Sequence, residues 1–190
     1  LNDSATEDAK GRFKREILAN SFFSHPGAID IYDAGETPGG NQFLAMEFLD
    51  SQDLEEILES ESQLDPAHAL LVCRQVFDVL GAAHEAGIVH RDVKPANILI
   101  SRDGERAKLM DFGVAILKDL GEFEHMVFQT IEGGATGTPQ YMSPEQAAGD
   151  AITPSSDLYS MALVLYVCLS GRLPYESETA SGFMACHMLE

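Results

Sequence analysis

Two short polar motifs near the middle of the chain bring together residue types suited to proton transfer. The first covers residues 90–97 and reads HRDVKPAN, and the second covers residues 111–113 and reads DFG. The carboxylate of Asp92 is ionised at neutral pH and could take the proton of a substrate hydroxyl. Lys94 follows two residues later, so in an extended segment its cation would lie on the same side as Asp92.

The same two motifs contain oxygen atoms of the kind that magnesium prefers. Asn97 offers a neutral carbonyl oxygen and Asp111 offers a charged carboxylate oxygen, both of them hard ligands. Residues 98–100 and 107–110 read as strands joined by a turn at residues 101–104. A hairpin is therefore predicted to connect the two motifs.

Two long helices are predicted to support these motifs. Asp65 and Pro66 form an N-cap and first-turn pair, and the helix that follows should end near Gly87. A second apolar helix is predicted from Asp157 to Ser170, closed by Gly171. The face of the first helix that we expect to be buried contains Leu70, Cys73, Val76, Phe77 and Leu80.

The N-terminal part of the chain reads as a helix followed by two strands. The helix is expected at residues 10–23, and the strands at residues 29–32 and 43–48, around a turn at residues 37–40. A short helix is expected at residues 53–58. Strand character gives way to helices at residues 50–52, so we predict a smaller domain, 1–50, and a larger one, 51–190. The alternative is that residues 50–52 are an ordinary surface loop.

Composition limits the class of protein. The chain has 190 residues, 45% of them apolar, enough for one sizeable core and a small accessory lobe. The formal charge of −19 argues against nucleic-acid binding. Three widely spaced cysteines favour a reducing, cytoplasmic setting, and the longest apolar stretch, 161–169, is too short for a membrane segment. The chain starts at Leu1 and ends in an unfinished helix, so we expect a fragment.

These motifs, taken in order, identify a family resemblance that covers essentially the whole chain. The chain resembles a eukaryotic-type Ser/Thr protein kinase domain of the bacterial branch. Residues 90–97 and 111–113 resemble its catalytic loop and metal-binding triplet, and residues 137–145, GTPQYMSPE, resemble the segment ending in Ala-Pro-Glu, with Ser143 in place of Ala. The resemblance implies an α+β, two-lobe protein-kinase-like fold that lacks the start of the small lobe and the end of the large one.

The resemblance implies a role for each polar residue of the two motifs. Asp92 would be the catalytic base, and Lys94 would stabilise the transferring phosphoryl group. Asn97 and Asp111 would hold Mg2+, and these two residues and Lys94 would contact ATP. Arg91 and Lys94 disfavour the related small-molecule phosphotransferases, so we expect protein substrates.

The resemblance also places the adenine of ATP next to residues 46–49. Met46 would be the gatekeeper, a role compatible with a plain core methionine. Backbone groups of Glu47 and Leu49 would hydrogen-bond the adenine edge, which any side chain at these positions would permit.

Further residues are expected to position the substrate and the catalytic loop. Thr138 would hydrogen-bond toward Asp92 and Lys94. Glu145 would normally pair with a downstream Arg, and we expect it to lack that partner here. Asp157 would brace the backbone of the catalytic loop, with helix N-cap as the alternative or additional role.

Regulation is expected to act through the segment between Asp111 and Glu145. Arg91 could pair with a phosphorylated residue there, for which Thr130 and Thr136 are the candidates, or they are ordinary loop threonines. Glu16 resembles the regulatory glutamate of the small lobe, or it is a solvated helix glutamate.

The expected function is transfer of the γ-phosphoryl group of Mg-ATP to protein serine and threonine hydroxyls. The alternative is a pseudokinase-type scaffold that binds partners without transfer. The family's Gly-rich loop and small-lobe Lys have no counterpart in these residues, and Asn20 and Ala162 depart from the family pattern. We therefore expect the 190 residues alone to have little or no activity.

Overall fold

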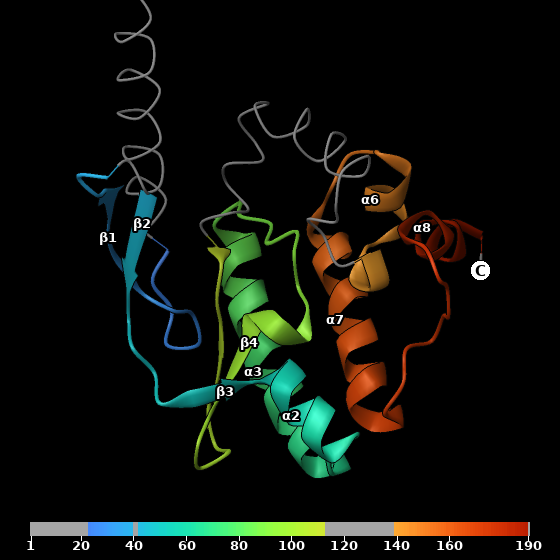
Figure 1. Ribbon diagram of the computed structural model, residues 1–190, viewed down its shortest axis with the longest axis horizontal. Helices are drawn as coiled ribbons and strands as arrows, with labels where there is room; N and C mark the ends of the chain where they lie inside the picture. The colour runs from blue at the N-terminus through green and yellow to red at the C-terminus, as the bar shows by residue number, and fades with distance from the viewer. Residues whose placement is uncertain (1–22, 40–41, 113–138, 190) are drawn as a thin grey trace, which may run out of the picture.

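The computed structural model describes residues 23–39, 42–112 and 139–189. Within these ranges, five strands form two small antiparallel sheets, and every α-helix follows residue 53 (Figure 1). The predicted helix at residues 10–23 lies outside the described residues, apart from Phe23. The mixture of small sheets and helices agrees with the predicted α+β class.

The first sheet pairs β1 (Ile31–Glu36) with β2 (Gln42–Met46). The predictions for these strands, residues 29–32 and 43–48, were partly wrong in their bounds. Residues 27–29 lie against strand β5 (Ala107–Leu109) instead, because the Ile29 amide donates to the Leu109 carbonyl at 3.1 Å and the Leu109 amide donates to the Gly27 carbonyl at 2.7 Å. Because residues 27–29 make this long-range pairing, β1 begins at Ile31 and not at residue 29 as predicted.

The second sheet carries the predicted hairpin between the two polar motifs. Its order is β3 (Ser51–Asp53), β4 (Ile98–Ser101), β5 (Ala107–Leu109), all antiparallel. The turn uses Gly104 at φ 73°, in the left-handed region that glycine adopts freely. Strand β3 occupies the predicted domain boundary, and the division of the chain at residue 50 stays a prediction.

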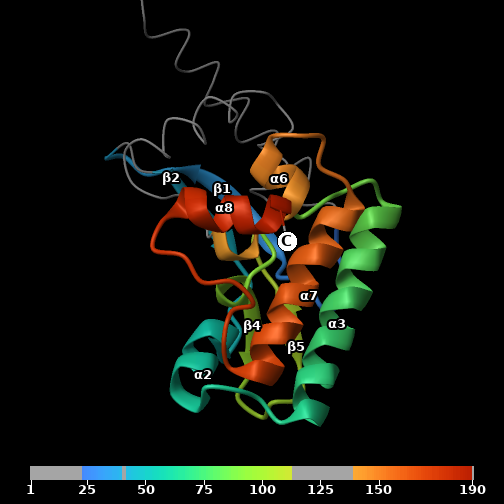
Figure 2. The ribbon, with the colours of Figure 1, turned by 90° about the vertical axis from the view of Figure 1, so that its right-hand side faces the viewer.

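Helices α3 (Pro66–Glu85) and α7 (Pro154–Ser170) pack side by side and form most of the core (Figure 2). Asp65 caps α3 as predicted, because its carboxylate accepts from the Ala67 amide at 2.9 Å. Gly171, at φ 70°, ends α7 as predicted. The residues that these two helices contribute to the core include Val72, Val76, Val79, Leu80, Met161, Val164 and Cys168.

The predicted buried face of α3 was wrong at two positions. Leu70 is 58% exposed and Phe77 is 37% exposed, whereas Ala69 and Ala83 are fully buried. Helix α3 lies between α7 and β5, so its close contacts favour a stripe that includes small residues. The predicted face contained large apolar residues, whereas the observed buried stripe includes alanines. The two faces therefore differ by part of a helical turn.

Besides the 3-10 helices η1 (Pro95–Asn97) and η2 (Pro139–Tyr141), the described part of the chain has three shorter α-helices. They are α2 (Leu54–Glu61), α6 (Pro144–Ala148) and α8 (Ala180–Leu189). Asp53 caps α2 through a 2.8 Å bond from the Glu56 amide, so this helix starts where predicted and runs three residues longer. Within the described ranges, no helix combines the length and apolar character needed to cross a membrane.

Candidate active site

The catalytic-loop motif places a cation and an amide against one carboxylate. The Lys94 Nζ atom lies 2.9 Å from Asp92 Oδ2, and Lys94 has extended backbone angles, as the spacing argument requires. Asn97 donates from Nδ2 to the Asp92 carbonyl at 2.8 Å and to Asp92 Oδ2 at 3.2 Å. Both donors use Oδ2, so the carboxylate is held in a fixed orientation.

His90 supports this loop from inside the core. Its Nε2 donates to the Met110 carbonyl at 2.8 Å, and its Nδ1 accepts from the Asp92 amide at 3.3 Å. Phe112 packs edge-on against the imidazole, with ring centroids 4.8 Å apart, and Phe23 packs on Phe112. Burial lowers the pKa of His90, which favours the neutral ring that this bonding pattern needs. Both His90 and Phe112 are buried.

The hairpin returns the chain to the catalytic loop at Asp111. The Met110 amide donates to the Asn97 carbonyl at 2.9 Å, which fixes the spacing between the two motifs. Asp111 has φ 69°, an uncommon backbone angle for a residue other than glycine. Burial raises the pKa of Asp111; the Asp92 charge adds to the increase, whereas His90 and Lys94 oppose it. A cation bound at this carboxylate would favour the ionised form of Asp111.

The residues present fit a magnesium ion. Because the Asn97 amide nitrogen is directed at Asp92, its carbonyl oxygen is the atom left for a ligand. Asp111 supplies a carboxylate, and magnesium is commonly held by one or two such groups together with substrate phosphates. No three His, Cys, Asp or Glu side chains gather into a metal site in the described part of the chain, so other ligands would have to complete the shell.

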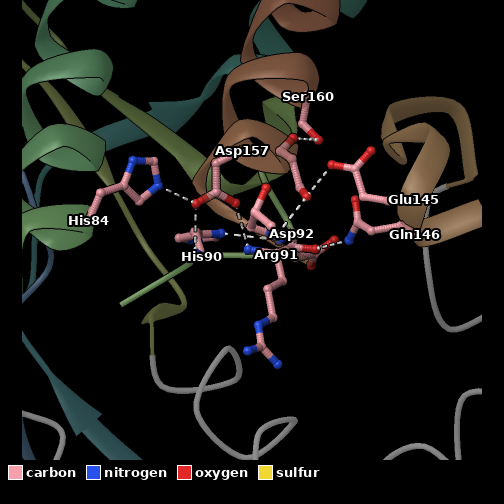
Figure 3. A network of polar contacts seen from close by, with 10 residues as sticks. His84, His90, Arg91, Asp92, Glu145, Gln146, Asp157 and Ser160 are labelled. Atoms are coloured by element: carbon pink, nitrogen blue, oxygen red, sulfur yellow. Dashed lines mark hydrogen bonds and ion pairs between the residues drawn. The ribbon is translucent and has the colours of Figure 1, made fainter. Parts of the chain in front are cut away.

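Asp157, on α7, braces the backbone of the catalytic loop (Figure 3). Its two oxygens accept from the His90 amide at 2.8 Å, from the Arg91 amide at 2.7 Å, and from His84 Nε2 at 2.7 Å. The side chain is 1% exposed. This geometry matches the predicted bracing contact. The alternative, that Asp157 is the N-cap of α7, is wrong, since Thr153 occupies the cap position.

Helix α6 is attached to both α7 and the catalytic loop. Glu145 accepts a short hydrogen bond from the Ser156 hydroxyl, and this bond lowers the pKa of Glu145. Gln146 donates from Nε2 to the Arg91 carbonyl at 2.7 Å. From the sequence we predict only a downstream Arg as the partner of Glu145. Neither its contact with Ser156 nor the bond from Gln146 to Arg91 was predicted.

Residues 46–49 lie at the end of β2, next to β5. The Glu47 amide donates to the Asp30 carbonyl at 2.8 Å, which leaves the Glu47 carbonyl as the backbone group for a ligand. The Glu47 carboxylate lies 2.6 Å from Lys108 Nζ, and this contact lowers the pKa of Glu47. Met46 is 39% exposed, and Leu49 is partly buried. The Glu47–Lys108 ion pair was not predicted, because its members lie 61 residues apart.

Four predicted site residues lie outside the described residues. They are Glu16, Thr130, Thr136 and Thr138. The structure brings together Asp92, Lys94, Asn97 and Asp111. Around the loop it has the predicted brace Asp157 and two residues that were not predicted, Gln146 and His84. A sequence signal for Gln146 existed in the Ser-x-x-Gln pattern of a capping box, but that pattern does not reveal its long-range bond.

A second buried histidine contacts the segment that precedes α6. His187, on α8, donates from Nε2 to the Pro139 carbonyl at 2.9 Å and accepts at Nδ1 from the Tyr159 hydroxyl at 3.0 Å. Burial lowers the pKa of His187. The neutral ring therefore links α7, α8 and the segment after residue 138.

We expect stability to fall as the pH drops below the ordinary histidine pKa of 6.5. His90 and His187 have lowered pKa values, so the unfolded chain binds protons there before the folded chain does. Above pH 6.5 neither state is charged at these rings and the effect vanishes. Glu47 and Glu145 protonate only at lower pH. Urea unfolding at about pH 7.5 and about pH 5.5 measures the difference.

The matched variant for this pH prediction is His187→Gln, which cannot titrate. Its loss of stability between the two pH values should be smaller than that of the parent protein. Equal unfolding midpoints for the parent at both pH values would contradict the assignment of neutral buried rings.

The loop, the hairpin and the bracing aspartate have the arrangement that the resemblance to a protein kinase domain implies. The match extends to the chain as a whole. The chain belongs to the protein kinase domain family, whose model matches residues 1–189.

The relatives are bacterial Ser/Thr kinases, as the sequence motifs led us to expect. Serine/threonine-protein kinase pkn3 of Myxococcus xanthus is 39% identical over 187 residues, 97% of this chain and 34% of that protein. Pkn2 of the same organism is 40% identical over 178 residues, 93% of this chain and 21% of that protein. PknB of Mycobacterium tuberculosis is 38% identical over 182 residues, 94% of this chain and 28% of that protein. The chain thus spans about a third or less of these relatives.

Proposed function

We propose that the protein carrying this chain transfers the γ-phosphoryl group of Mg-ATP to serine and threonine hydroxyls of protein substrates. The observation that carries the proposal is the grouping of Lys94 and Asn97 on one oxygen of Asp92, with Asp111 placed beside them by the hairpin. Membership of the protein kinase family and relatives named as Ser/Thr kinases support it.

In this proposal Asp92 is the catalytic base. The substrate hydroxyl oxygen bonds to the γ-phosphorus, and the bond from that phosphorus to the β–γ bridging oxygen breaks. ADP leaves with the electron pair, and the hydroxyl proton passes to Asp92. Lys94, 2.9 Å from Asp92, stabilises the charge on the transferring oxygens.

Asn97 and Asp111 would hold the metal, and the backbone of Glu47 and Leu49 would hold the adenine beside Met46. The ion supplies positive charge that neutralises the phosphates and orients them. Asn97 is already held by its bonds to Asp92, so its carbonyl oxygen needs little reorganisation to bind.

Protein substrates and regulation belong to the same proposal. Thr138 and Glu145 would position the substrate-binding segment, and Arg91 would receive a phosphate on Thr130 or Thr136. Glu16 would complete the regulatory helix of the small lobe.

The free thiols of Cys73, Cys168 and Cys186 support a reducing cytoplasmic location.

The test is an assay of the complete protein with Mg-ATP labelled at the γ-phosphate and a general protein substrate. The product should contain phosphoserine or phosphothreonine. Nucleotide or partner binding without any transfer would contradict the proposal and favour the pseudokinase-type scaffold. Label on tyrosine alone would contradict the substrate class.

A further inference from the structure

We propose that Gln146 is a positioning residue for phosphoryl transfer. In this role it fixes the peptide between Arg91 and Asp92 and ties it to the start of α6. The inference rests on the proposed function for its effect on rate. Its structural part, the restraint of one peptide plane, can be tested without any activity.

Both ends of the Gln146 amide are used. Its Nε2 donates to the Arg91 carbonyl at 2.7 Å, and its Oε1 accepts from the Ser143 amide at 3.0 Å. The Ser143 hydroxyl in turn accepts from the backbone amide of Gln146, which completes a capping box. Ser143 is fully buried. A side chain fixed at both ends can orient the group it contacts 55 residues away.

The peptide that Gln146 contacts requires such support. Arg91 has φ 69°, in the left-handed region that residues with a Cβ adopt at a cost in free energy. Such angles persist where the surrounding contacts determine them. Asp157 fixes the peptide on the N-terminal side of Arg91 through the Arg91 amide.

The peptide on the C-terminal side of Arg91 has its own pair of contacts. The Arg91 carbonyl and the Asp92 amide belong to one plane, and they bond to Gln146 and to His90 Nδ1 respectively. The Asp92 Cα atom lies at the end of this plane. A rotation of the plane would therefore move the carboxylate of Asp92 relative to a substrate hydroxyl.

Helix α6 has other attachments, so the loss of Gln146 need not release it. Glu145, in α6, accepts from the Ser156 hydroxyl of α7, and the Ser160 hydroxyl of α7 donates at 2.7 Å to the carbonyl of Tyr141, which lies shortly before α6. The bond from Gln146 crosses instead to the catalytic loop. Gln146 thus couples the end of the substrate-binding segment to the residue proposed as base.

The experiment compares two substitutions with a matched control in the complete protein. Gln146→Leu removes both bonds, whereas Gln146→Glu keeps an acceptor for the Ser143 amide and loses the donor to Arg91. The control is Gln75→Leu, because Gln75 also uses both ends of its amide, on the Glu105 carbonyl and the Ala107 amide, each at 3.0 Å. Gln75 supports the hairpin turn and does not contact the catalytic loop.

We expect kcat to fall by roughly ten- to a hundred-fold in both Gln146 variants, since small misplacements of reacting groups have effects of this order. The KM for ATP should change by less than about two-fold, and Gln75→Leu should keep the parent kcat. An unchanged kcat in Gln146→Glu would overturn the proposal, because the capping box and not the Arg91 bond would then matter.

Hydrogen exchange of the Asp92 amide provides a readout independent of transfer. It should speed up in Gln146→Glu and stay at the parent rate in Gln75→Leu. Unchanged exchange in Gln146→Glu would overturn the inference even if the parent transfers phosphate. If the parent protein does not transfer phosphate but the Asp92 amide still exchanges faster in Gln146→Glu, the restraint by Gln146 is supported and the proposed function is rejected. Gln146→Glu also serves if Gln146→Leu does not fold.

Discussion

Replacement of Asp92 by asparagine should lower the rate of phosphoryl transfer by about 10²- to 10⁴-fold, the range of general-base contributions. The amide keeps the shape of the carboxylate but cannot take the proton of the substrate hydroxyl. Lys94 and Asn97, which bond to Asp92 Oδ2, would remain near the site. Because neither the adenine contacts nor Asp111 changes, the affinity for Mg-ATP should stay close to that of the parent protein.

Initial rates at saturating Mg-ATP, together with nucleotide binding by calorimetry, measure this prediction. The control is Asp78→Asn, since Asp78 is an exposed carboxylate 3.7 Å from a basic side chain, Arg74, and lies on α3 away from the loop. Asp78→Asn should keep the parent rate. A parent-like rate in Asp92→Asn would show that another group accepts the proton.

Replacement of Asp157 by alanine should lower the free energy of unfolding by at least about 3 kcal/mol, since each buried donor left without an acceptor costs about 1–3 kcal/mol. Three donors lose their acceptor: the His90 amide, the Arg91 amide and His84 Nε2. The site is buried, so water can replace the lost acceptor only in part. Transfer should fall as well, because the catalytic loop loses its attachment to α7.

Urea unfolding of the complete protein measures this loss, with Asp65→Ala as the control. Asp65 is also a carboxylate that accepts backbone bonds, but it is an exposed N-cap of α3, whose loss costs about 1 kcal/mol. Equal losses in the two variants would contradict the claim that Asp157 is a buried brace.

The features predicted correctly from the sequence are those set by neighbouring residues. Asp65 and Pro66 specify the start of α3, Gly171 ends α7, and the hairpin between the motifs follows from its turn residues. The short distance between Lys94 and Asp92 also follows from a spacing of two in extended backbone. Each of these features depends on contacts within a few positions along the chain.

The features that were missed depend on contacts between distant segments. Strand β1 begins later than predicted because residues 27–29 pair with β5, about 80 positions away. Gln146 meets Arg91 across 55 positions, and Lys108 meets Glu47 across 61. Periodicity and turn signals carry no information on which distant backbone group a polar side chain will reach.

We propose that Asp92, Lys94, Asn97 and Asp111 form one phosphoryl-transfer centre. A crystal structure of the complete protein with Mg2+ and a non-hydrolysable ATP analogue would show whether they do. We expect a metal ion bound to the Asn97 carbonyl oxygen and the Asp111 carboxylate, with the γ-phosphate facing Lys94 and Asp92. A nucleotide bound without a metal at Asn97 and Asp111, or with its γ-phosphate directed away from Asp92, would contradict it.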